Sequence, residues 1–237
     1  MKLTKAGLFL LTLTGLFCCR TVSELAKYQL SDGYYKSAVF DQKSKLVYID
    51  NSEDIISIYL ADQATKNVDT ISNPKRKLPQ TVSDITLKSN TFRQASLDID
   101  FLTIPFKYRP RLDAFPRQFN TNLNGAVYVG YRNDIYQLRY DKTPLKNYQR
   151  QTRHYGYSIG LLTGLGGTTI NSSVTNNQIT YEYDGLVWSK GIAGIIGVNN
   201  FTIGLAVGFD DLLDYNKTYW IYQTKPWIGL AFGLNLN

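Results

Sequence analysis

The chain has 237 residues, a formal net charge of +7, 43% hydrophobic residues and 14% aromatic residues. It contains no run of eighteen or more apolar residues, which excludes a transmembrane helix. One histidine and two cysteines leave only carboxylates as potential metal ligands, so we expect neither a metal nor a cofactor. This length accommodates one or two domains.

Residues 1–19 are predicted to be a secretory signal peptide. Lys2 and Lys5 form its charged end, and 7–17 form an apolar core that is too short to span a bilayer. The motif LFCC resembles the cleavage site of bacterial lipoproteins, with Cys19 as the residue that would be lipidated. An ordinary signal peptide with cysteines beside its cleavage site is the alternative. Both cysteines lie here, so we expect no disulfide framework in the rest of the chain.

Residues 20–79 are predicted to form a small β-element followed by a polar linker. Strand-like runs occupy 33–39, 45–49 and 55–60, with polar turns between them. Residues 61–79 have no apolar period and read as the linker. We expect this part of the chain to lie outside any bilayer.

Basic residues cluster at 74–77 and again at Lys107, Arg109, Arg111 and Arg117, which we expect to lie in a loop. Removal of the signal lysines lowers the net charge from +7 to +5. For an exported chain, anionic lipid headgroups are a better partner for these clusters than nucleic acid. Solvated loops are the default interpretation.

From residue 80 to 237 the sequence alternates with period two, which is typical of strands. One set is large and apolar, and the other is mostly Gly, Ala and Ser, whereas a soluble sandwich would carry Lys, Glu and Thr outside. The pattern therefore predicts a transmembrane β-barrel with lipid outside. The predicted lipid-facing residues are Leu123, Val127, Val129, Tyr157, Ile159, Leu161, Ile203, Leu205, Val207, Ile228, Leu230, Phe232 and Leu234. The predicted lumen-facing residues are Gly156, Ser158, Gly160, Gly204, Ala206, Gly208, Gly229, Ala231 and Gly233.

We expect about eight antiparallel strands, an even number as in bacterial barrels. Two-residue hairpin turns are predicted at 199–200 and within 132–135, and Pro105 suggests that one strand ends or bulges there. The strands are expected at 80–88, 95–106, 122–132, 135–142, 153–166, 184–198, 201–211 and 225–236.

The signal peptide, the glycine-rich alternating strands and three segments together resemble small outer-membrane β-barrel proteins of Gram-negative bacteria, most closely uncharacterised Bacteroidetes-type barrels. The segments are DGLVWSKGIAG, VGFDDLLD and KPWIGLAFGLNLN. The resemblance covers roughly 95–237 and carries no functional motif. Many such barrels end in an aromatic residue that the assembly machinery reads, whereas this chain ends in Asn237.

Few residues suggest chemistry. His154 shares its strand face with Ser158, but four strand residues separate them by about 13 Å, so we expect an interfacial histidine rather than a Ser-His pair. Asp210, Asp211 and Asp214 form an acidic group that would suit a cation such as Ca²⁺, with solvated turn residues as the favoured interpretation. The glycine-rich run 164–169 is followed by no lysine and no helix, which excludes a phosphate-binding loop.

We therefore expect a non-enzymatic outer-membrane β-barrel that is a structural or accessory component of an envelope assembly. Its partners would be outer-membrane lipid and an envelope protein that docks on residues 20–79. A membrane-embedded lipid-modifying enzyme and a narrow passive pore are the alternatives. A filled lumen is favoured over a pore, because a barrel with so few strands leaves little room and the inward positions show no ring of charge.

Overall fold

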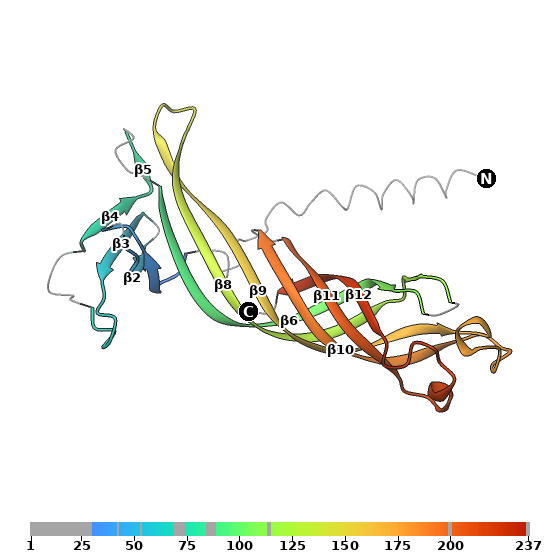
Figure 1. Ribbon diagram of the computed structural model, residues 1–237. Coiled ribbons are helices and arrows are strands. Elements are labelled where there is room, and N and C mark those ends of the chain that lie inside the picture. Colours follow the sequence, from blue (N-terminus) through green and yellow to red (C-terminus); the bar gives the residue numbers. More distant parts are fainter. Residues whose placement is uncertain are drawn as a thin grey trace, which may run out of the picture.

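The computed structural model describes residues 30–41, 43–52, 54–68, 74–83, 89–112, 115–198 and 201–235 (Figure 1). The predicted signal peptide, Cys19 and the predicted turn at 199–200 lie outside these residues. Regular structure in the described residues consists of strands and two short 3-10 helices, so the all-β prediction is confirmed. No helix there is both long and apolar enough to cross a membrane.

All pairs of neighbouring strands are antiparallel, and three of the strands are about twenty residues long. The strands are β1 Gly33–Ser37, β2 Lys45–Asn51, β3 Ile55–Leu60, β4 Arg76–Pro79, β5 Thr81–Val82, β6 Asn90–Arg109, β7 Gln118–Asn120, β8 Asn124–Lys142, β9 Tyr148–Ile170, β10 Tyr183–Val198, β11 Phe201–Leu212 and β12 Pro226–Asn235. The 3-10 helices are η3 Ser173–Thr175 and η4 Tyr215–Thr218.

Six long strands pair in a closed circuit, which we call the first ring. Its order is β6, β8, β9, β10, β11 and β12, and β12 returns to pair with β6 (Figure 1). The expected count of eight is not confirmed. The expected strands 122–132 and 135–142 are the single strand β8, and of the expected strand 80–88 the described part holds only the short β5.

The turn expected within 132–135 is absent, and this part of the prediction was wrong. Asn133 and Asp134 continue the ladder, pairing with Ala95 and Gln94 of β6 on one side and with β9 on the other. Two neighbouring strands hold the backbone extended here, which outweighs the local turn preference of an Asn-Asp pair.

A β-bulge lies beside Pro105 in β6. The β12 residues Leu230 and Phe232 are two apart, but their partners Phe106 and Thr103 are three apart. The extra residue in β6 agrees with the expectation that Pro105 ends or bulges the strand, because proline cannot donate to the ladder.

The first ring is strongly staggered. Partners followed once around the ring from Asp98 of β6 return to β6 at Lys107, nine residues further along. Every residue between these two on the path is small: Gly130, Gly160, Ala193, Ala206 and Gly229. Such a stagger requires strands that tilt against the ring axis, as closure of a sheet does in general.

Apart from β7, which pairs with the end of β6, the remaining strands close a second circuit, which we call the second ring. Strands β1, β2, β3 and β4 form a meander, β1 pairs with the start of β6, and β5 directly after β4 pairs with β9. The second ring therefore shares β6, β8 and β9 with the first. Three runs expected as strands in the small β-element are confirmed as β1, β2 and β3, but part of the expected linker is strand β4.

The second ring has an ordinary apolar core. Its buried residues are Leu30, Tyr35, Val47, Ile49, Ile56, Ile58, Leu78, Phe92, Tyr136 and Leu138. Tyr35 packs edge-on against Tyr136, with ring centroids 5.8 Å apart. Burial raises the pKa of both phenols, so they stay neutral at physiological pH.

Three longer connections gather at the opposite end of the first ring. They run over 110–123, 171–182 and 213–225, whereas β10 and β11 are joined at the other end through two residues. Another apolar cluster lies at that end, made of Ile170, Val174, Val187, Leu212, Trp220 and Tyr222.

Candidate functional site

The interior of the first ring is filled by side chains. At its centre lie buried apolar groups, of which Tyr128 and Trp227 are the largest. Buried charged and polar side chains flank this apolar centre. The loop-end layer lies towards the long connections and is built around Lys107, Arg109 and Asp210. The junction layer lies towards the second ring and is built around Asp98, Arg132, Asp134 and His154.

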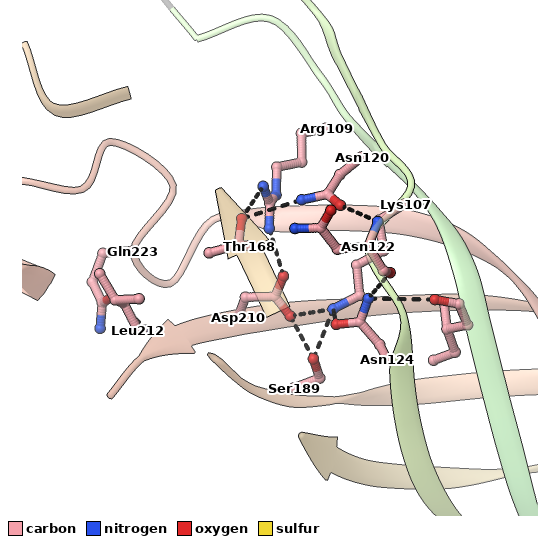
Figure 2. Close-up of polar contacts among 11 residues, drawn as sticks. Lys107, Arg109, Asn120, Asn122, Asn124, Thr168, Ser189, Asp210, Leu212 and Gln223 are labelled. Atoms are coloured by element: carbon pink, nitrogen blue, oxygen red, sulfur yellow. Dashed lines mark hydrogen bonds and ion pairs between the residues drawn. The ribbon is translucent and has the colours of Figure 1, made fainter. Parts of the chain in front are cut away.

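Two cations share one carboxylate in the loop-end layer (Figure 2). Lys107 Nζ lies 2.8 Å from Asp210 Oδ1, and Arg109 Nη2 lies 2.8 Å from Asp210 Oδ2. All three side chains are at most 3% exposed. Charges this deeply buried are tolerated only when they are paired and hydrogen-bonded, so the layer depends on Asp210.

Lys107 uses its whole donor capacity within the layer. Besides Asp210, Nζ donates to Asn124 Oδ1 at 2.9 Å and to Ser189 Oγ at 2.7 Å, which accounts for three ammonium protons. Ser189 in turn donates to Asp210 at 2.7 Å. The ammonium also lies 4.5 Å from the centroid of the Trp227 ring, a distance suited to a cation–π contact.

Arg109 is held on several sides. Its Nη1 donates to Thr168 Oγ1 at 3.2 Å, and its guanidinium lies 5.1 Å and 5.0 Å from the ring centroids of Trp220 and Tyr222. Burial raises the pKa of the Tyr222 phenol, which therefore faces the guanidinium as a neutral group.

The bulge beside Pro105 is what points Lys107 and Arg109 inward. Leu102 and Ile104 are buried before it, and with strict alternation Phe106 would come next. One extra residue reverses the parity, so Phe106 is exposed and Lys107 is buried. The expectation that Lys107 and Arg109 belong to a loop was therefore wrong, because both lie in β6. Only Pro105 could have signalled this in the sequence.

Among the described residues, the junction layer contains one buried arginine, Arg132, and three buried aspartates. Arg132 Nε donates to Asp134 Oδ1 at 2.8 Å, and its Nη1 lies 3.3 Å from Asp98 Oδ1. His154 Nε2 lies 2.6 Å from the same Asp134 oxygen. Asp100, also fully buried, lies two residues from Asp98 on the same face of β6.

Glycines make room for this layer. A Cβ at Gly130 would lie 2.3 Å from the Tyr128 hydroxyl, and one at Gly156 would lie 2.7 Å from Arg132 Nη2. The small residues at inward positions therefore allow Tyr128 and Arg132 to fold across the interior, which fits the expectation of a filled lumen. No ring of charge at inward positions was evident in the sequence. The structure adds buried ion pairs there, formed by inward residues of β6, β8, β9 and β11.

The predicted candidates for chemistry do not come together. His154 is 1% exposed and inside β9, so it is not interfacial as expected. The Ser158 hydroxyl bonds instead to Tyr128, at 2.7 Å. The run 164–169 lies inside β9 and is not a loop.

The three aspartates expected to form one acidic group have three separate roles. Asp210 pairs with the buried cations, Asp211 lies 2.6 Å from Lys190 Nζ, and Asp214 accepts from the backbone N–H of Asn216 at the start of η4. No cluster of three or more potential metal ligands occurs among the described residues.

The predicted outward and inward sets differ in exposure as the alternation requires. Leu205 is 61% exposed and its neighbour Ala206 is fully buried. Of the predicted lipid-facing set, Leu123, Val127, Val129, Tyr157, Ile159, Leu161, Ile203, Leu205, Val207, Ile228 and Leu230 are exposed and Phe232 is half-buried. Of the predicted lumen-facing set, Gly156, Ser158, Gly204, Ala206, Gly208, Gly229 and Ala231 are buried, and Gly160 and Gly233 are half-buried. The side chain of Leu234 is not described.

Comparisons with protein-family models, with characterised proteins and with solved structures find no match to this chain.

Proposed function

We propose that the first ring is a membrane-embedded β-barrel that anchors the chain in the outer membrane of a bacterial envelope. The observation that carries the proposal is an unbroken apolar row around its outer face. Register partners followed once around the ring give Ile99, Val129, Leu161, Ile192, Val207, Ile228 and Tyr108. All seven are between 37% and 68% exposed, which is a large contiguous surface to leave in water.

The height of the apolar surface suits a bilayer. On β9 the outward residues from Tyr155 to Leu165 are apolar except for Thr163, whose hydroxyl accepts a bond from Trp188 Nε1 at 2.8 Å. Ten residue steps of about 3.3 Å, at a tilt of about 40°, span about 25 Å. That height matches the apolar band of outer-membrane barrels.

Loop length supports one orientation. Outer-membrane barrels have short periplasmic turns and longer outer loops. The three long connections would then face outward, and the second ring would lie in the periplasm. An envelope protein that docks on residues 20–79 would contact the surface of the second ring, where Lys36, Asp50 and Lys77 are exposed.

We propose a structural or accessory role rather than conduction or catalysis. Buried side chains such as Tyr128, Leu162 and Trp227 fill the interior, which argues against a passive pore. Purified protein is expected to show no stable conductance steps in planar bilayers. His154 contacts Asp134 while Ser158 bonds to Tyr128, so the two do not form a nucleophile–base pair.

Membrane fractionation combined with gel mobility tests the anchor. The full chain should be recovered with outer membranes after a carbonate wash, and unboiled protein should migrate differently from boiled protein. Recovery in the soluble fraction, with no change of mobility on boiling, would remove the barrel proposal.

A lipid profile tests the enzymatic alternative separately. Overproduction of the wild-type chain should leave envelope lipids unchanged relative to a His154→Gln variant. A lipid product that depends on His154 would replace the accessory role with a catalytic one.

A further inference from the structure

A polar cavity of about 390 Å³ opens at the loop end of the first ring, beside the loop-end layer. Cations and neutral polar groups dominate its wall: Arg109, Arg117, Asn120, Asn122, Thr168 and Asn171. Arg109 forms the floor, because it is 3% exposed and also belongs to the buried layer. Arg117 reaches the cavity from the connection after β6 and is exposed.

The charges around the floor of the cavity do not balance. Lys107 and Arg109 are both buried, and within the described part of the chain the one carboxylate that pairs with them is Asp210. Lys107 spends its three protons inside the layer, whereas Arg109 has five N–H donors and gives one bond to Asp210 and one to Thr168. A buried cation that shares its counter-charge is stabilised by a further anion.

The neutral groups of the wall are arranged around the same guanidinium. Asn120 Nδ2 donates to Thr168 Oγ1 at 3.1 Å, the hydroxyl that also accepts from Arg109 (Figure 2). Asn120 Oδ1 accepts from the backbone N–H of Asn122 at 2.8 Å, which fixes the turn that carries the Asn122 side chain to the cavity. The wall is therefore ordered by its own hydrogen bonds before a ligand arrives.

We propose that this cavity binds a phosphate-class oxyanion, as inorganic phosphate or as a phosphomonoester on a lipid headgroup. Arg109 at the floor and Arg117 at the mouth supply the two guanidinium groups, whose planar forks suit phosphate oxygens. Amide and hydroxyl groups of Asn122 and Thr168 complete the polar surroundings.

The rim also shows where an anion would not bind. Glu182 accepts a bond from Asn171 at 3.3 Å, and Asp184 accepts one from Thr169 at 3.2 Å. These carboxylates disfavour an oxyanion beside Asn171 and Thr169, so the proposed ligand would lie on the side of Arg109 and Arg117.

Titration of the full chain with inorganic phosphate in detergent, followed by calorimetry and ³¹P NMR, tests the site without requiring a bilayer. Wild-type protein should bind phosphate saturably. Arg117→Gln should weaken binding about tenfold, since it removes one charge-assisted contact from an exposed position. Arg109→Lys keeps the buried charge and should also weaken binding. Arg153→Gln removes an exposed arginine of β9 beyond the other end of the ring and should leave binding unchanged.

A second arm identifies the source of the phosphate. Nanodiscs that contain phosphatidic acid are compared with nanodiscs of phosphatidylcholine alone. Saturable binding of phosphate in detergent supports a soluble ligand, and ³¹P shifts only with phosphatidic acid, lost in Arg117→Gln, support a headgroup. Absence of binding in both arms, or equal loss in Arg117→Gln and Arg153→Gln, would overturn the proposal. A chain that binds phosphate but fails to insert into nanodiscs would contradict the membrane anchor alone.

Discussion

The two rings share three strands, yet they differ in the side chains that they bury and expose. The second ring encloses aliphatic and aromatic side chains and exposes Lys36, Asp50 and Lys77. The first ring exposes aliphatic side chains such as Leu161 and encloses ion pairs beside small residues. The same β-ladder therefore carries two different patterns of buried and exposed side chains.

Strand β8 shows the change within one continuous strand. In its first half Val127 and Val129 point outward, whereas near its end the exposed residues are Arg139, Asp141 and Lys142. The inward set changes from Ala126 in the first ring to Leu138 in the second. The polar residues at 132–134 lie where the two patterns meet. A break in the pattern that looks like a turn is here a boundary between two patterns of burial.

Removing the carboxylate of the loop-end layer is expected to have the largest effect on stability. Asp210→Ala should lower the free energy of unfolding in detergent by about 3–5 kcal/mol, because two buried cations lose their common partner. Asp211→Ala is the matched control. It breaks a more exposed pair with Lys190 and should cost less than about 1 kcal/mol. Equal losses in urea titrations would show that the interior layer adds nothing special.

A charge on the outer face tests which ring contacts lipid. Leu205→Arg should destabilise folding into lipid vesicles by about 2–4 kcal/mol, since an arginine would lie in hydrocarbon. Leu145→Arg places the same charge on the hairpin after β8, at an 83% exposed position of the second ring, and should have little effect. Both variants should be tolerated alike only if the first ring lies in water.

A smaller effect is expected from a single methyl group inside the first ring. Gly130→Ala should cost about 1–3 kcal/mol, because the new Cβ would collide with the Tyr128 hydroxyl. Gly194→Ala is the control, since its Cβ would have no neighbour within 4 Å. Thermal unfolding of the two variants in detergent compares them directly, and a Gly130 variant as stable as wild type would argue against a tightly filled interior.

The smallest effect on folding is expected at the N-terminal end of the chain. Cys19→Ser should abolish labelling by a fatty-acid analogue while gel mobility of the folded chain stays unchanged. A lipid at Cys19 would tether the second ring to the membrane from its other end. Persistent labelling of the variant would exclude Cys19 as the modified residue.

Local sequence patterns were sufficient to predict which face of a strand each side chain occupies. Because side chains alternate with period two, the sequence alone assigns Leu205 and Ala206 to opposite faces, whatever the neighbouring strands are. The same reasoning found β1, β2 and β3 and the irregularity at Pro105. It could not decide the strand count, because whether residues 132–135 turn or continue depends on partners in β6 and β9.

The sequence by itself determined that this protein is all-β and that each strand has a fatty and a small face, since both follow from neighbours along the chain. Only the tertiary structure decided that the long strands close a ring of six and continue into a second ring. It also decided which charges meet inside. Lys107 and Asp210 are 103 residues apart, and they become partners only because the bulge beside Pro105 and the stagger of the ring bring them to one layer. Contacts of this kind depend on register across many strands, which no local pattern encodes.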